Sequence, residues 1–275
     1  MRILVFCLAL LATPAHAEPA SKLFGAAKTP APGKAQVFGS YAKGCHAGAV
    51  QFPADGPHWA AMRLSRDRRW VQPVLADFLL RLTQRAHRAG LDGLLIGDTG
   101  QARGGPMKSG HRSHQTGLDV DIWLRPLTTR PNAAERETLS SYDVVKGRKA
   151  LDTALWGKSS ARAIPLAAAD PAVARIFVHP VIKRKLCEVT DGQPRPWMNK
   201  IRPWWGHDAH FHVRLACPAG STTCEDQQAP PAGDGCGKKL DWWFTDAPYG
   251  GSSTPRKPLT MADLPAACAA VVAAN

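Results

Sequence analysis

The chain of 275 residues has no long apolar run after its N-terminal segment, and it has few acidic residues. The missing runs exclude a protein with several membrane spans, because one span needs roughly 20 apolar residues. Asp and Glu number 22 against 35 Lys and Arg, which gives a formal net charge of +13. Apolar residues make up 44% and charged residues 21%, so wholesale disorder is excluded as well. The composition favours a compact basic protein with an anionic partner.

The first 17 residues have the pattern of a secretory signal peptide. Arg2 precedes an apolar run that is too short for a bilayer span, and the segment ends in the small residues Ala15-His16-Ala17. This pattern predicts cleavage after that ending, export of the protein, and no stable membrane insertion. We expect residues 1–17 to be a signal peptide and residues 18–275 to form a single mature domain.

The chain also lacks a CxxC pair, which is the usual mark of a thiolate zinc site. Cys7 lies in the predicted signal peptide, so the mature chain keeps six cysteines: Cys45, Cys187, Cys217, Cys224, Cys236 and Cys268. In an oxidising compartment this even number predicts up to three disulfides, whose pairing the sequence leaves open. Their spacing predicts a disulfide-rich C-terminal extension at about residues 217–275.

Hydrophobic periodicity predicts helices and loops. Apolar positions between Val71 and Ala89 recur at helical spacing, and the Ala-rich residues 151–170 have a helical tendency. Residues 18–57 are rich in Pro, Gly and Ala and predict an extended strap. Residues 99–113 are too rich in Gly and polar groups for a regular element, so we expect a loop at an edge of the fold.

Short apolar runs and alternating segments predict the strands. Runs at 94–96 and 176–178 are typical of buried strands, whereas 118–124 and 210–215 alternate between apolar and polar residues. Together with the helices, these segments predict an α+β fold. We expect a small, mainly antiparallel sheet flanked by helices, with long disulfide-tied loops.

Histidines cluster beside these alternating strands. Five of the ten lie in two short segments: His111, His114, His207, His210 and His212. Asp119 and Asp121 share one face of the strand 118–124. Two His and one carboxylate are ligands that a catalytic zinc takes, with a water at the open position. The alternation does not distinguish Asp119 from Asp121 as the ligand. His46, His58, His87 and His179 are expected to be surface residues.

Two motifs carry a resemblance to a known family. The run Ser113-His114-Gln115-Thr116-Gly117-Leu118-Asp119-Val120-Asp121 matches the His, Gly and Asp spacing of the signature of the lysostaphin and D-Ala-D-Ala metallopeptidase group, and His210-Phe211-His212 matches its closing HxH. Within that group, Gly97-Asp98 and the tail Cys224-Glu225-Asp226-Gln227 make the chain most similar to the penicillin-insensitive murein endopeptidases, which cut peptidoglycan cross-links in the periplasm.

The resemblance implies a role for each matching residue. It implies one Zn²⁺ ion per chain with three ligands: His114, Asp121 and His212. It makes His210 the general base for a zinc-activated water, and it implies that His207 is a further catalytic residue near the cleft. His111 resembles a further metal-associated histidine, although residues 143–151 offer no partners for a second metal. The implied reaction is hydrolysis of the D-alanyl to meso-diaminopimelyl bond in periplasmic peptidoglycan.

Several further roles are hypotheses from the residue types. Asp119 orients the imidazole of a metal ligand. Arg214 or Arg112 binds substrate and stabilises the oxyanion, and Trp204 lines the substrate site. The basic charge suits the free carboxylates of cross-linked muropeptides.

Other functions remain as alternatives. Ser40 and Lys43 form an SxxK pattern, which would indicate a serine-type D,D-peptidase if it opened a buried helix. A zinc-dependent murein-binding protein without turnover would share the predicted fold. A secreted metal nuclease would share the His and Asp chemistry, but no nucleic-acid motif supports nucleic acid as the partner.

Overall fold

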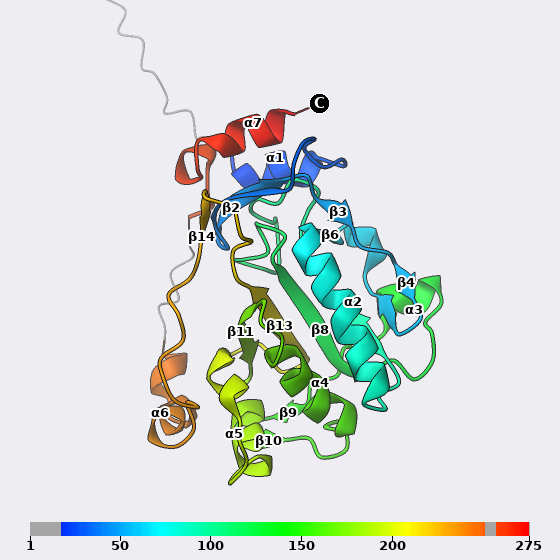
Figure 1. The fold of residues 1–275 in the computed structure, drawn as a ribbon, viewed down its shortest axis with the longest axis vertical. Coiled ribbons are helices and arrows are strands. Elements are labelled where there is room, and N and C mark those ends of the chain that lie inside the picture. The colour runs from blue at the N-terminus through cyan, green and yellow to red at the C-terminus, as the bar shows by residue number, and fades with distance from the viewer. Residues whose placement is uncertain (1–17, 251–256, 275) are drawn as a thin grey trace, which may run out of the picture.

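The computed structural model describes residues 18–250 and 257–274 (Figure 1). The predicted signal peptide, with Cys7, lies outside these described residues. Among the described helices, none has the length and apolar character needed to cross a membrane.

The central element is a mixed sheet whose strand order is β12-β11-β13-β8-β7-β5-β4. In chain order its strands are β4 Asp55–Gly56, β5 Trp59–Ala61, β7 Leu94–Ile96, β8 Asp119–Pro126, β11 Val173–Val178, β12 Ile201–Pro203 and β13 His210–Leu215. The pairs β11 with β12 and β5 with β7 are parallel. The other neighbours are antiparallel. The α+β fold with a mainly antiparallel sheet is therefore confirmed.

Two helices cover one face of this sheet (Figure 1). They are α2 Pro73–Arg88 and α4 Lys158–Ala168. Pro73 occupies the first turn of α2, where its missing N–H costs nothing, and Gly90 follows the helix at φ 76°. Fully buried side chains of α2, such as Phe78, pack with Val120 and Ile122 of β8 in the main core. Because β8 alternates, this packing directs Asp119 and Asp121 to the opposite face.

The N-terminal region is more ordered than the expected strap. It contains α1 Ala20–Ala26, β1 Gln36–Ser40, β2 Lys43–Ala47 and β3 Val50–Gln51. Phe24 of α1 is fully buried in a second core together with Cys268 of the last helix, α7 Ala267–Ala273. This segment therefore folds because a C-terminal partner far away in the sequence covers it, which local periodicity does not reveal.

The remaining elements are short. They are β6 Trp70–Val71, α3 Ala133–Thr138, β9 Val145–Lys146, β10 Ala150–Leu151, α5 Pro180–Val189, β14 Cys224–Glu225, α6 Lys238–Asp241 and the 3₁₀ helices Leu64–Arg66, Pro196–Lys200, Trp242–Phe244, Ala247–Tyr249 and Met261–Asp263. The predicted loop at residues 99–113 contains no helix or strand.

The structure contains three disulfides among the described residues, two of which tie the C-terminal extension to the rest of the fold. They join Cys45 to Cys268, Cys187 to Cys236, and Cys217 to Cys224. The prediction of three disulfides is confirmed, and the structure supplies the pairing that the sequence left open. Two of the three cross-links connect residues at least 49 positions apart, so they constrain large loops in the unfolded chain.

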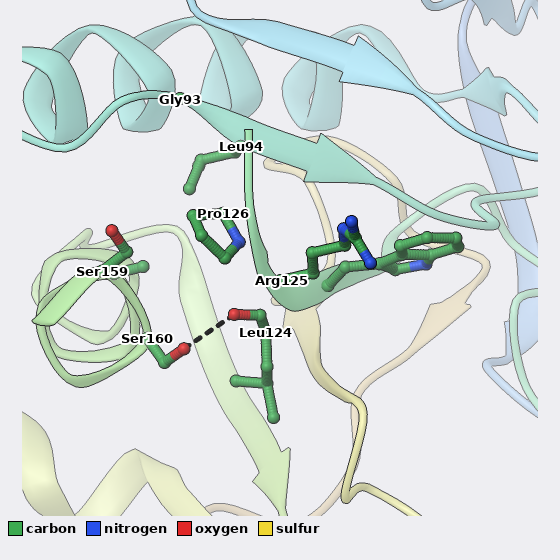
Figure 2. A pocket seen from close by; sticks show the side chains of 9 residues that line it. Gly93, Leu94, Leu124, Arg125, Pro126, Ser159 and Ser160 are labelled. Carbon is green, nitrogen blue, oxygen red and sulfur yellow. Dashed lines mark hydrogen bonds between the residues drawn. The ribbon is translucent and has the colours of Figure 1, made fainter. Parts of the chain in front are cut away.

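A small pocket lies between β7, the end of β8 and the start of α4 (Figure 2). Its lining includes Leu94, Arg125 and Ser160, and the Ser160 hydroxyl donates to the carbonyl of Leu124 over 2.7 Å. No histidine or acidic side chain lines it. The chemistry-bearing side chains gather elsewhere, on the face of the sheet that α2 and α4 leave free.

Candidate metal centre

The pairing of β8 with β13 places the predicted residues on one face. His212 lies opposite Asp121, Arg214 opposite Asp119, and His210 opposite Trp123. Directly opposed residues in an antiparallel pair point to the same side of the sheet, so these alternating polar positions form one cluster. Phe211, Val213 and Leu215 of β13 are fully buried on the other side.

The loop before β8 brings His114 back onto this cluster. His114 has φ 65° and Gly117 has φ 68°, so the backbone turns sharply twice through the left-handed region. At Gly117 a Cβ atom would lie 2.9 Å from the Gln72 backbone nitrogen, which explains the glycine. The strained backbone of His114 is stabilised by a bond from its own N–H to Asp119 Oδ2 at 3.0 Å.

Four histidine side chains surround the carboxylate of Asp121. Asp121 Oδ1 lies 3.4 Å from His114 Nε2, 3.5 Å from His210 Nε2 and 3.5 Å from His212 Nδ1. Asp121 Oδ2 lies 3.5 Å from His111 Nδ1. The Asp121 side chain is only 6% exposed, so these contacts are largely shielded from water.

Three of the histidine rings are held from behind by an acceptor. His114 Nδ1 lies 2.7 Å from the Thr99 carbonyl, and because a carbonyl only accepts, this nitrogen carries the hydrogen. His212 Nε2 lies 2.7 Å from Asp119 Oδ1, and His111 Nε2 lies 3.0 Å from Asp98 Oδ2. In the neutral tautomers these bonds select, the other nitrogen of each ring directs a lone pair at Asp121.

Burial and charge shift the pKa values of these groups. Burial lowers the pKa of His212 to about 3. For His114, burial also opposes protonation, but the charge of Asp121 prevails and raises its pKa. Asp121 itself is buried, yet the surrounding histidines, His210 foremost, hold its pKa well below the usual range. The Asp121 carboxylate is therefore held ionised between the His212 ring, which stays neutral, and the His114 ring, whose protonation the carboxylate favours.

Two atoms at the centre of the cluster lack a partner. His114 Nε2 and Asp121 Oδ1 are buried and have no hydrogen-bond partner among the described residues. Lone pairs that face one another at 3.4 Å in a buried site repel unless a cation lies between them. Ligand atoms of His111, His114 and Asp121 lie within 4.8 Å of one another, close enough to share one metal ion. Imidazole nitrogen and carboxylate oxygen suit a divalent transition metal, so the residues present fit a metal ion.

The other predicted site residues lie at different distances from this centre. The His207 ring lies 5.1 Å from that of His210, and its Nδ1 lies 3.0 Å from the Trp205 carbonyl. Burial, assisted by His210, lowers the pKa of His207 to about 4, so this ring is neutral at pH 7. Trp204 is exposed beside Phe177, whose ring lies 5.3 Å from that of His212.

The two predicted substrate arginines have different environments. Arg214 is only 7% exposed; its Nε donates to Asp119 over 2.8 Å and its Nη1 donates to Gln227 over 2.8 Å. Arg214 therefore shares the Asp119 carboxylate with the His212 imidazole, on the side of that ring away from Asp121. Arg112 is exposed in the loop beside His111.

Sequence reasoning missed two contributors and misplaced two histidines. The Thr99 carbonyl and the Asp98 carboxylate hold the rings of His114 and His111, but both come from the irregular segment after β7, where no periodicity marks them. The expectation that His46 and His179 are surface residues is wrong. His46 is fully buried and bonds to Gln101 and Gln72, and His179 is 3% exposed and caps α5.

The SxxK pattern does not open a helix. Ser40 ends β1 and Lys43 begins β2, so the two residues face each other across a hairpin. Lys43 is exposed to solvent. The arrangement therefore lacks the buried helical start that a serine D,D-peptidase needs.

Comparison with known proteins gives a consistent result. A family model described as penicillin-insensitive murein endopeptidase matches residues 37–273. Curated proteins of that name from Salmonella arizonae and Klebsiella pneumoniae are 45% and 43% identical to this chain over 244 residues, which is 88% of each chain. One from Escherichia coli O1:K1 / APEC is 43% identical over 268 residues, or 96% of this chain and 95% of the relative.

Proposed function

Because the chain belongs to the penicillin-insensitive murein endopeptidase family, we propose that it is a periplasmic, metal-dependent peptidase that hydrolyses the D-alanyl to meso-diaminopimelyl cross-links of peptidoglycan. The observation that carries the metal-dependent part is the convergence of inner imidazole nitrogens on a buried carboxylate that has an unpartnered oxygen. A structural cluster of buried histidines would pair these atoms with hydrogen bonds instead.

We assign the metal ion to a ligand set drawn from the loop and the two central strands. The ligands would be His114, Asp121 and His212, with His111 on the solvent side. Two histidines and one carboxylate are a ligand set of catalytic zinc sites, and the six described cysteines, which form disulfides, do not compete as ligands, so we assign the ion as Zn²⁺. When bound, such a cation acts as a Lewis acid that lowers the pKa of a water molecule and polarises the scissile carbonyl.

His210 is the residue we assign as general base. Its Nε2 lies 3.5 Å from Asp121 Oδ1, and its side chain is 23% exposed, so it reaches both the metal centre and solvent. It accepts the proton of the attacking water and delivers it to the leaving amine. His207 lies next to it as a neutral ring, with Nδ1 turned to the Trp205 carbonyl and Nε2 free for substrate.

The remaining assignments follow from exposure. Arg112 is exposed beside His111 and is suited to bind a substrate carboxylate. Trp204 lies at the border of the site, where its ring contacts that of Phe177. Arg214 acts from behind, through Asp119, on the orientation of His212. The net charge of +13 attracts the anionic polymer to the protein.

The proposal is tested with purified mature protein and cross-linked muropeptide dimers. Zinc-loaded protein should release monomers, and a chelator or the substitution His210→Ala should abolish that release. If zinc-loaded protein binds the dimers but leaves them intact, the protein is a murein-binding protein and not an enzyme. Penicillin acylation of Ser40 or cleavage of plasmid DNA would favour the serine peptidase or the nuclease.

A further inference from the structure

A patch of four tryptophans lies beside the metal centre and outside its chemistry. Trp204, Trp205 and Trp242 are 42%, 43% and 49% exposed, whereas Trp243 is half-buried between them. We call Trp204, Trp205, Trp242 and Trp243 the tryptophan platform. Exposed large aromatic side chains are normally scattered singly, so a contiguous group of this size indicates a binding surface.

The platform is assembled from two segments far apart in the sequence. Trp204 and Trp205 follow β12, and their rings stack at 4.7 Å with an interplanar angle of 22°. Trp242 and Trp243 follow α6 in the C-terminal extension, and the Trp243 ring lies 6.0 Å from Trp204 and 5.6 Å from Trp205. The disulfide between Cys187 and Cys236 anchors the extension just before α6. The platform is therefore held in place while its outer rings stay open to solvent.

A continuous path of rings joins the platform to the metal centre. The Phe177 ring lies 5.3 Å from His212 and 6.1 Å from Trp204, and the next step to Trp243 is 6.0 Å. Phe177 also lies 5.9 Å from His207. A substrate that occupies the metal centre thus has this aromatic surface directly beside it.

We propose that the tryptophan platform binds the sugar rings of a peptidoglycan glycan strand while the cross-link peptide occupies the metal centre. This inference rests on the proposed function, because it presumes a peptidoglycan substrate. The C–H-bearing face of a pyranose ring is apolar and packs flat on an indole, while the sugar hydroxyls stay in water at the rim. Trp204, Trp205 and Trp242 of the platform offer partly exposed indole rings for such packing.

The reach from platform to metal centre agrees with the covalent structure of such a substrate. The bond to be cut is separated from the sugar by a short peptide stem. Four extended residues span at most about 13 to 14 Å, which exceeds the two ring-to-ring steps of 5.3 and 6.1 Å that lead from His212 through Phe177 to Trp204. A glycan strand that packs on the platform at Trp204 therefore has a stem peptide long enough to enter the metal centre.

Two variants and two substrates test the proposal. Trp205→Ala and Trp242→Ala remove exposed rings, and Leu80→Ala, at a residue of α2 that is 46% exposed, is the matched control. Each platform variant should weaken binding to peptide-free glycan strands by about three- to tenfold. Cleavage of intact sacculi should slow by a similar factor, whereas cleavage of sugar-free cross-linked peptide dimers should keep its rate. The Leu80→Ala protein should match the wild type in all three assays.

Equal binding and equal sacculus cleavage by the wild type and both platform variants would overturn the proposal. So would platform-dependent binding to phosphatidylglycerol vesicles without binding to glycan strands, which would make the patch a membrane contact. If light scattering shows that the wild-type protein is a dimer and both variants are monomers, while glycan binding stays intact, the patch is instead a contact between two copies of the chain. If the wild type fails to cut the sugar-free dimers, the proposed function fails, and binding to glycan strands still decides the role of the platform.

Discussion

The substitution Asp119→Asn probes how the metal centre is held together. Asp119 is fully buried and accepts bonds from the His114 backbone N–H, from His212 Nε2 and from Arg214 Nε, over 3.0, 2.7 and 2.8 Å. An amide keeps the shape but loses the charge and one acceptor oxygen. Oδ1 of Asp119 accepts from both His212 and Arg214, and Oδ2 accepts from the His114 N–H. The single amide oxygen can serve only one of these two sides, so the amide NH₂ faces a donor on the other side and one histidine loses its acceptor.

The expected losses follow from these three bonds. Removal of an acceptor behind a metal-bound histidine typically lowers metal affinity 10- to 100-fold, which is about 1.4 to 2.7 kcal/mol. Breaking a buried charge pair from one side costs about 3 to 5 kcal/mol of stability, an upper bound here because Asn keeps one oxygen for Arg214. We expect Asp119→Asn to lose metal affinity and folding stability together.

The assay combines zinc competition with a chromophoric chelator and urea unfolding of the metal-free protein. Asp170→Asn is the control, because Asp170 is a buried carboxylate paired with Arg81 and Arg85 of α2, on the helical side of the sheet. That control should lose stability and keep its zinc affinity. Zinc binding by Asp119→Asn within a factor of two of the wild type would refute the argument that the Asp119 charge positions His212.

Three more outcomes are expected. His210→Ala should lower the rate of dimer cleavage by about 10²- to 10⁴-fold with full metal content, measured by product release and elemental analysis. Removal of the metal by dialysis against a chelator should lower the melting temperature, and re-addition of Zn²⁺ should restore it, because a ligand of the folded state stabilises that state. Lys183 is fully buried, and burial lowers its pKa to about 7, so the unfolded chain binds more protons above that pH and the free energy of unfolding should rise from pH 7 to pH 9. Lys183→Met should flatten that rise in urea titrations, and an unchanged slope would contradict the assignment.

The parts of the fold that depend on local periodicity were predictable. The period of 3.6 at residues 71–89 gives α2, and the period of two at 118–124 and 210–215 gives β8 and β13. Alternation fixes which side chains share a face whatever the neighbouring strand is. It follows that Asp119 and Asp121 could be grouped on one polar face before any pairing was known.

The parts that depend on contacts between distant segments were not predictable. The order of the sheet, the pairing of Cys45 with Cys268, and the burial of Phe24 under α7 all join ends of the chain. The Thr99 carbonyl behind His114 is a backbone group, so no side-chain pattern signals it. The tryptophan platform likewise needs the C-terminal extension to return to the end of β12.

The disulfide-tied extension is part of the support of the metal centre. From His212 a chain of polar contacts runs through Asp119 to Arg214 and on to Gln227. Gln227 lies just beyond the short loop that the Cys217–Cys224 disulfide closes, next to Asp226, which accepts the Cys217 backbone N–H.

The hydroxyl of Tyr41 adds a second link, because it lies 2.7 Å from the Leu215 carbonyl at the end of β13 and 2.8 Å from Asp226. The Arg214 guanidinium lies 4.2 Å from the centre of the Tyr41 ring, so the two links meet. Arg214 is oriented by its two acceptors, Asp119 and Gln227, and Gln227 follows shortly after the Cys217–Cys224 cross-link. The cross-link thus lies next to the side chains that orient the His212 imidazole, which gives a physical reason for a disulfide directly after the strand that carries His210 and His212.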